Sequence, residues 1–186
     1  LPIPKRMRWG ASRVEFVRPV QWLVMLFGSE VVNGEVLGLK AGNTSRGHRF
    51  HAPGEITIAN PAEYQDKLRA AYVMADFAER AALINEQVAA KGKELGGEAV
   101  IDADLLDEVT ALNEWPVALA GSFDEDFLRV PPEALVSSMK EHQKYFHVMK
   151  DGKLMPNFIT IANIESKDPA QVISGNEKVI RPRLSD

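Results

Sequence analysis

The alternation of apolar and polar positions predicts short strands in the first third of the chain. Residues 16–28 rise into an apolar run that ends at a glycine, and Asn33-Gly34 stands between β-branched residues. An Asn-Gly pair in that setting is typical of a type I′ turn, which predicts a hairpin about this dipeptide. Residues 41–54 lack any period and are expected to form a loop, and residues 55–58 alternate as a short strand.

The middle and end of the chain carry helix signals. Asn60 precedes Pro61, and Glu63 follows at the spacing of a capping box, so a helix is predicted from here to about residue 93. A break is expected near residues 74–77, where the apolar stripe is interrupted. Further helices are predicted over residues 103–113, 131–142 and 168–175, with Asp102 capping the first and Gly175 ending the last.

Three further segments are predicted to be strands. Residues 117–121 form one, and residues 145–149 and 154–162 form a hairpin about Asp151-Gly152, with Pro156 at an edge or a bend. Alternation places Phe146 and Val148 in the core and leaves Tyr145 and His147 for a ligand groove. The order of elements predicts one α+β domain over residues 1–186, with a mixed or antiparallel sheet, hairpins and a long helix.

The composition is typical of a soluble globular protein and excludes cysteine chemistry. The chain has 186 residues, 45% of them hydrophobic and 26% charged, and no cysteine, which excludes disulfides and thiolate chemistry. The absence of cysteine agrees with a cytoplasmic protein, and no apolar run reaches the roughly 20 residues of a membrane span. Because the first residue is not methionine, we also expect an internal piece of a longer chain.

Charge is unevenly distributed along the chain. Residues 1–50 carry eight Lys/Arg against three Asp/Glu, residues 51–130 six against sixteen, and residues 131–186 eight against seven. The basic beginning suits a polyanion and the acidic middle would repel one, although an acidic middle is also typical of solvated helix faces.

The loop over residues 44–51 concentrates chemistry that suits RNA. Arg46 and Arg49 offer bidentate phosphate donors, and Phe50 between His48 and His51 offers a stacking face. Two alternatives stay open for the histidines: they hydrogen-bond the loop onto the sheet, or they ligate a metal. The metal alternative lacks an HExxH pattern and would need ligands from elsewhere.

A second cluster at residues 141–147 holds the remaining two histidines. His142 and Lys144 are candidate RNA-binding residues, or else they interact with the terminal carbonyls of the preceding helix. We expect this cluster and the loop to lie side by side and form one RNA-facing surface. No catalytic residue is assigned, because the chain has no phosphate-binding glycine loop, no dinucleotide fingerprint and no Gly-x-Ser-x-Gly elbow.

Seven short motifs in register resemble the family of beta subunits of bacterial heterotetrameric glycyl-tRNA synthetase. Together they span nearly the whole chain. They are residues 7–10 (MRWG), 16–22 (FVRPVQW), 46–51 (RGHRFH), 114–117 (EWPV), 130–131 (VP), 142–146 (HQKYF) and 175–179 (GNEKV).

The resemblance implies an internal fragment of the beta chain and a fold similar to the editing-type domain of the phenylalanyl-tRNA synthetase beta chain. It further implies ATP-dependent attachment of glycine to its tRNA, with the alpha subunit as partner and as the site of glycine activation. The expected contribution of this segment is binding of glycine tRNA and assembly. ATP and magnesium would serve the whole enzyme, and no cofactor, metal, DNA or membrane is expected at this segment.

Two alternatives to tRNA binding remain. One is a hydrolytic editing-type domain that deacylates mischarged tRNA, and the other is a purely structural spacer. Glycine is the smallest amino acid, so a size sieve against larger ones needs no second site. Together with the missing catalytic constellation, this favours the binding or spacer function over editing.

Overall fold

The computed structural model describes residues 3–185 and divides the chain into two compact units, Leu1–Val73 (unit 1) and Met74–Asp186 (unit 2). The expectation that all 186 residues form one domain stays a prediction, as does the similarity to the editing-type domain of phenylalanyl-tRNA synthetase. In the described part of the chain, no helix has the length and apolarity needed to cross a membrane.

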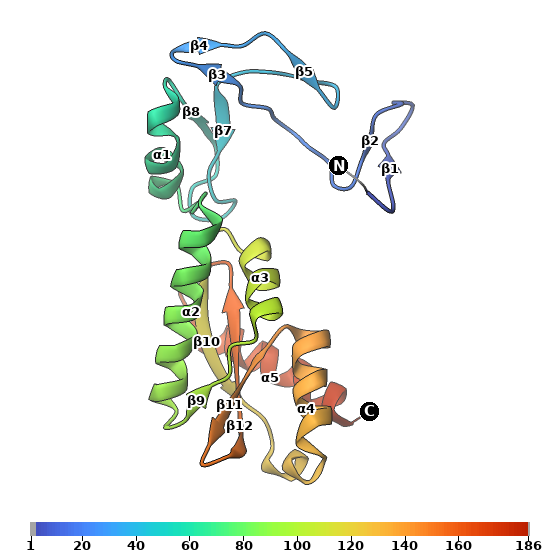
Figure 1. Cartoon of the computed structure of the whole chain (residues 1–186), viewed down its shortest axis with the longest axis vertical. Coiled ribbons are helices and arrows are strands. Elements are labelled where there is room, and N and C mark those ends of the chain that lie inside the picture. Colours follow the sequence, from blue (N-terminus) through green and yellow to red (C-terminus); the bar gives the residue numbers. More distant parts are fainter. Residues whose placement is uncertain (1–2, 186) are drawn as a thin grey trace. The chain divides into compact units, whose positions relative to one another are not determined.

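Unit 1 consists of two-stranded antiparallel ribbons followed by a short helical segment (Figure 1). Its strands pair in sequence order, β1 with β2, β3 with β4, β5 with β6 and β7 with β8. The elements are β1 (Met7–Arg8), β2 (Glu15–Phe16), β3 (Leu26–Phe27), β4 (Glu30–Val31), β5 (Glu35–Val36), β6 (Leu39–Lys40), β7 (Thr44–Arg46), β8 (Glu55–Thr57), the 3-10 turn η1 (Pro61–Glu63) and α1 (Tyr64–Ala70).

The predicted hairpin turn at Asn33-Gly34 is wrong. The chain reverses instead at Gly28-Ser29, between β3 and β4, and at Leu37-Gly38, between β5 and β6. Leu37 and Gly38 both have positive φ, 53° and 78°, as a type I′ turn requires. Gly34 lies in extended pairing, where its carbonyl accepts from the Ala41 N–H at 2.8 Å, and this pairing overrides the local turn preference.

The cap at Asn60 is confirmed, and so is the break in the long helix. The Asn60 Oδ1 accepts a hydrogen bond from the Ala62 N–H at 3.0 Å. Helix α1 ends at Ala70, and α2 (Phe77–Glu94) begins after a non-helical segment. A second cap opens α2, where the Asp76 carboxylate accepts from the Glu79 N–H at 2.8 Å. The sequence therefore predicted correctly both the length of this helical region and the break within it.

Unit 2 is a four-stranded antiparallel sheet with helices on both faces. The strand order is β10-β12-β11-β9. Besides α2, the elements are β9 (Glu98–Ala99), α3 (Ala103–Leu112), β10 (Val117–Ser122), the 3-10 helix η2 (Glu125–Arg129), α4 (Pro132–Ser138), the π-helical turn η3 (Met139–Gln143), β11 (Phe146–Lys150), β12 (Lys153–Ala162) and α5 (Pro169–Ser185).

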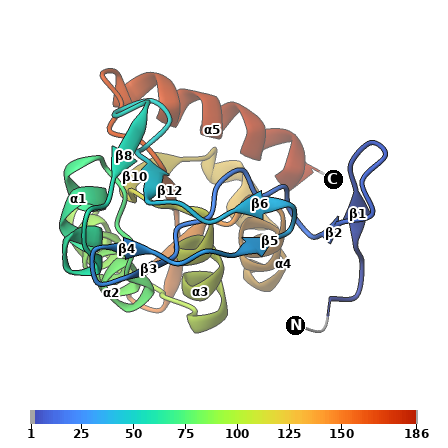
Figure 2. The same ribbon diagram turned by 90° about the horizontal axis from the view of Figure 1, so that it is seen from above.

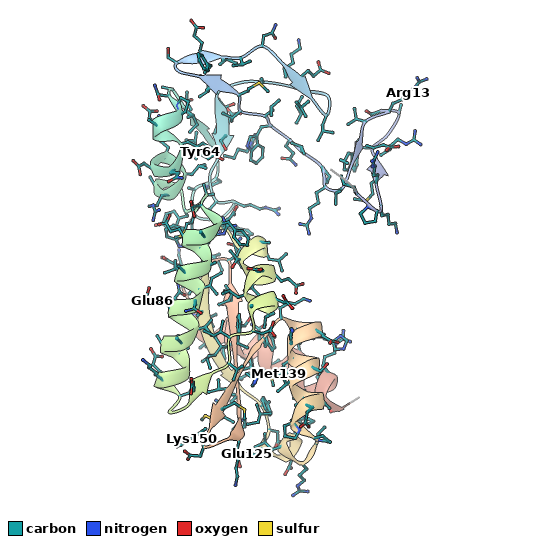
Figure 3. The ribbon with its side chains drawn as sticks, in the orientation of Figure 1. Arg13, Tyr64, Glu86, Glu125, Met139 and Lys150 are labelled. Atoms are coloured by element: carbon teal, nitrogen blue, oxygen red, sulfur yellow. The ribbon has the colours of Figure 1, made fainter. Side chains whose placement is uncertain are left out.

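Each face of this sheet has its own apolar core. On one face, residues of α2 and α3 such as Ile84 and Val109 pack on Phe146 and Val148, which confirms the predicted inward face of β11. On the other face, Leu135, Ile180 and their neighbours cover Phe158. Figure 2 shows α5 on the side of the unit opposite α3, and Figure 3 shows Glu86 on the outward, solvated face of α2.

Pro156 lies in a central strand rather than at an edge. Strand β12 pairs with both β10 and β11, and its register with β11 shifts between His147 and Met149, opposite Pro156. Because proline has no N–H to donate, an irregularity at this point is expected. The predicted edge position is therefore wrong, and the predicted bend stays a prediction, since β12 runs unbroken through Pro156 with a register shift against β11.

Gly175 does not end its helix, contrary to the prediction. Helix α5 continues for ten residues beyond it, so that Ile180 and Leu184 are buried against the sheet. Burial of these two side chains outweighs the penalty of about 1 kcal/mol for glycine inside a helix.

Gly175→Ala is therefore expected to raise the free energy of unfolding by about 0.5–1 kcal/mol, because alanine favours the helix. A Cβ at this position would meet no atom within 4 Å. The matched control is Gly121→Ala, whose Cβ would fall 2.4 Å from Phe158 Cζ and should destabilise the protein. Denaturant unfolding measures both, and a loss of stability in Gly175→Ala would contradict the continuous helix.

Candidate functional site

The loop that contains the first histidine cluster connects two short paired strands, β7 and β8. Strand β7 pairs with β8 so that Arg46 stands opposite Glu55, and residues 47–54 connect the two strands. Within the predicted loop, Thr44–Arg46 is thus a strand, which sequence periodicity had not indicated. Gly47 passes so close to its neighbours that an added Cβ would lie 2.5 Å from the Ala52 carbonyl oxygen. Only glycine permits this approach.

His48 holds the loop together from inside. Its side chain is 1% exposed, and its Nδ1 accepts from the N–H groups of Phe50 and His51, both at 3.2 Å. Its own N–H donates to the Ala71 carbonyl at 2.9 Å, which ties the loop to the end of α1. The geometry therefore favours, for His48, the alternative in which a histidine fastens the loop, because a buried ring does not face a ligand.

His51 continues this arrangement toward the end of α1. Its ring stacks on Tyr72, with centroids 4.6 Å apart and planes 27° apart, and lies 4.7 Å from the His48 ring. Tyr72 has a φ of 61°, an unusual conformation for a non-glycine residue. The two histidines and Tyr72 thus form a ring cluster under the loop.

Arg46 and Arg49 are the exposed cations of this loop, and each lies beside an aromatic ring. The Arg46 guanidinium is 5.9 Å from the Trp22 ring centroid, and that of Arg49 is 5.6 Å from Phe50. Phe50 is 68% exposed and Trp22 is 41% exposed. One carboxylate competes here, since Glu55 Oε1 lies 3.9 Å from Arg46 Nη2. A fixed loop that presents cations beside exposed rings can bind phosphate and stack on planar groups.

The second cluster lies in unit 2, at the turn from η3 into β11. His142 is exposed in the π-helical turn, and Lys144 follows it with a φ of 60°. The Lys144 ammonium contacts Glu108 Oε1 at 2.8 Å and donates to the Glu141 carbonyl at 3.1 Å. The second of these contacts is the helix-end interaction that the sequence left open. The prediction that this cluster and the loop of unit 1 form one surface stays a prediction.

Tyr145 does not line a ligand groove as predicted. Its ring is 3% exposed and stacks on Phe158 with centroids 4.4 Å apart, and its hydroxyl donates to Asn176 Oδ1 at 2.7 Å. Burial raises the pKa of Tyr145 to about 12, which keeps the hydroxyl protonated. The physical reason for the error is that α4 and α5 cover this face of the sheet.

His147 lies on the same side of β11 as Tyr145 and is half-buried. Burial lowers its pKa, and the charge of Asp102 opposes this shift. Asp102 is itself held ionised, since the Leu105 N–H and the Lys140 ammonium lower its pKa. Through the Leu105 N–H and the Lys140 ammonium, Asp102 caps the start of α3. Among residues 3–185, no group of three or more His, Asp or Glu side chains is placed to hold a metal ion.

Sequence reasoning missed two residues of the loop site, Trp22 and Glu55. Trp22 precedes the loop by more than twenty residues, and no periodic pattern connects the two segments. Glu55 opposite Arg46 would have been found by pairing residues 44–46 with residues 55–57 as a hairpin. The irregular composition of residues 41–54 concealed that register.

Comparison with known proteins shows which protein family this chain resembles. A family model described as glycyl-tRNA synthetase beta subunit matches residues 1–186. The chain is 65% identical to the glycine–tRNA ligase beta subunits of Hahella chejuensis and Marinobacter nauticus and 60% identical to that of Stutzerimonas stutzeri, over 100% of its own length. It spans 27% of the length of each of these relatives.

Proposed function

The chain belongs to the family of glycyl-tRNA synthetase beta subunits, and from this premise we propose that it binds glycine tRNA within the intact enzyme through the exposed cations of residues 46–49. Its relatives are named as subunits of an aminoacyl-tRNA synthetase, which is an enzyme of translation. The name beta subunit also implies a complex with an alpha subunit.

The observation that carries this proposal is the fixed presentation of Arg46 and Arg49. Both guanidinium groups lie beside exposed aromatic rings, on a loop that His48 fastens from within. The surrounding sequence is basic, with eight Lys/Arg against three Asp/Glu over residues 1–50, whereas the whole chain has a net charge of −4. A local cationic surface on an acidic chain suits a polyanion and does not depend on overall charge.

Under this proposal, the chemical steps of the reaction take place outside this segment. Glycine activation with ATP and magnesium belongs to the alpha subunit in this scheme, and the present segment contributes binding and no catalytic residue. His51 supports the loop, and the exposed His142 contributes a second RNA contact from unit 2. The enzyme acts in the cytoplasm, where its tRNA is found.

The proposal predicts the behaviour of Arg46→Ala/Arg49→Ala in the intact enzyme. The apparent KM for tRNA should rise about tenfold or more, because two phosphate contacts are lost. Its logarithmic dependence on salt should fall by about two units of slope, since fewer counterions are released on binding. Glycine-dependent ATP–pyrophosphate exchange should stay near the wild-type rate.

Arg129→Ala is the matched control, because the Arg129 side chain is 86% exposed and belongs to unit 2. It should leave tRNA kinetics near wild type. If the double variant bound tRNA normally while its melting temperature fell, the loop would be a structural clamp. The segment would then fit the spacer function, and the proposal would fail.

A further inference from the structure

A cavity of about 210 Å³ opens beside Arg46 within unit 1. Its lining includes the rings and polar side chains of Gln21, Trp22, Lys40, Thr44, Arg46 and Glu55. Pockets for drug-sized ligands are typically larger, about 300–1000 Å³. The cavity therefore suits one small planar group and is too small for a folded peptide or a dinucleotide.

Trp22 gives this cavity a stacking face. Its indole is 41% exposed and belongs to neither apolar core of the described chain. The Arg46 guanidinium lies 5.9 Å from the indole centroid, so a cation and a large π-face meet at the rim. Aromatic platforms paired with basic side chains are the usual means by which proteins hold unpaired nucleotides.

The remaining lining groups suit the other parts of a nucleotide. The Thr44 hydroxyl and the Gln21 amide can each donate and accept hydrogen bonds, as the edge of a base requires. The Lys40 ammonium and the Arg46 guanidinium can meet the phosphate on either side of that base. In a duplex the bases stack on one another, so only an unpaired or extruded nucleotide reaches such a cavity.

We propose that this cavity holds a single unpaired nucleotide of bound RNA, with its base stacked on Trp22 and its phosphate on Arg46. The inference rests on the proposed tRNA-binding function and specifies the part of the RNA that is bound. It also explains why the loop needs a fixed position, since a stacking site works only if its cation and its ring keep their spacing.

Glu55 weakens phosphate binding in this site, because its carboxylate also attracts the Arg46 guanidinium. Its Oε1 lies 3.9 Å from Arg46 Nη2 and on the cavity wall, where it competes with a phosphate for the guanidinium. Glu55→Gln removes the negative charge and keeps the shape of the side chain. RNA affinity should therefore rise a few-fold in this variant, the opposite of the change expected on losing a merely structural ion pair.

The test uses the intact enzyme and two RNA probes. The first is glycine tRNA that carries the fluorescent base 2-aminopurine at one unpaired position at a time, and the second is a blunt-ended RNA duplex, in which every nucleotide is paired. Stacking on an indole quenches 2-aminopurine. Wild-type enzyme should quench one position of the tRNA, and Trp22→Leu should remove that quenching and weaken tRNA binding about tenfold. Binding of the duplex should not change.

Trp22→Phe is the conservative control: it removes the indole that quenches but keeps a stacking ring, so tRNA affinity should stay near that of the wild type. The nucleotide site is overturned if no position is quenched by wild-type enzyme, or if Trp22→Leu weakens both probes equally. The two proposals fail in different ways. If Arg46→Ala/Arg49→Ala weakens tRNA binding while Trp22 variants do not, only the nucleotide site is wrong. If the arginine variants bind both probes normally, the proposed function fails as well.

Discussion

His48→Ala should lower the free energy of unfolding by about 2–4 kcal/mol and release the loop at residues 47–54. The variant removes the acceptor for two backbone N–H groups, those of Phe50 and His51, and leaves a cavity in the place of a ring that is 1% exposed. Each buried donor left without a partner costs about 1–3 kcal/mol. Denaturant unfolding of the 186-residue chain, which we expect to fold by itself, measures the loss.

Hydrogen exchange makes this prediction specific to the loop. The amides of Phe50 and His51 should exchange much faster in His48→Ala, whereas those of unit 2 should not change. His48→Asn is the matched control, because its side-chain oxygen lies near the position of Nδ1 and can accept from the same N–H groups. Equal losses in both variants would contradict the assignment of Nδ1 as the acceptor that orders the loop.

Phe158→Ala is expected to have the largest effect on unit 2, a loss of about 3–5 kcal/mol. Phe158 is 0% exposed in the central strand β12, where its ring stacks on Tyr145 and covers Gly121. Removing the ring leaves a cavity between the sheet and α5 that the surrounding backbone cannot close. Far-ultraviolet circular dichroism during denaturant unfolding follows the loss.

Phe27→Ala removes the same side chain from an exposed position and serves as the control. Phe27 is 82% exposed in unit 1, so this variant should change stability by no more than about 0.5 kcal/mol. Similar costs for the two alanine variants would mean that Phe158 does not anchor the second core, and the two-faced sheet would be wrong.

Local signals in the sequence predicted several elements correctly because they depend on neighbouring residues alone. Asp102 caps α3 through the Leu105 N–H at 2.9 Å, and Asp151-Gly152 turns the β11–β12 hairpin with both φ angles positive. A cap or a tight turn is determined by the hydrogen bonds and dihedral angles of a few adjacent residues. Nothing distant is needed to predict it.

The errors arose where tertiary packing overrode a local preference. Gly175 would end an isolated helix, but Ile180 and Leu184 further along α5 are buried against the sheet and extend it. Tyr145 was assigned to a groove, but α5 and α4 pack over this face of the sheet and bury it. Both errors come from packing between distant segments, which spacing along the sequence does not reveal.

In the candidate site, too, the sequence identified residues from local patterns but not contacts between distant segments. Arg46 and Arg49 were identified from a short basic and aromatic segment, and the structure places both on the surface beside aromatic rings. The buried position of His48 and the proximity of Trp22 depend on how the loop folds back toward Ala71 and toward the earlier strands. Neither follows from spacing in the sequence.

The central claim is that the loop of residues 46–49 contacts tRNA, and a structure of the intact synthetase with glycine tRNA bound tests it most directly. We expect phosphate oxygens within hydrogen-bonding distance, about 2.7–2.9 Å, of the Arg46 and Arg49 guanidinium groups. A complex in which the tRNA binds elsewhere, while both guanidinium groups face protein or bulk water, would contradict it.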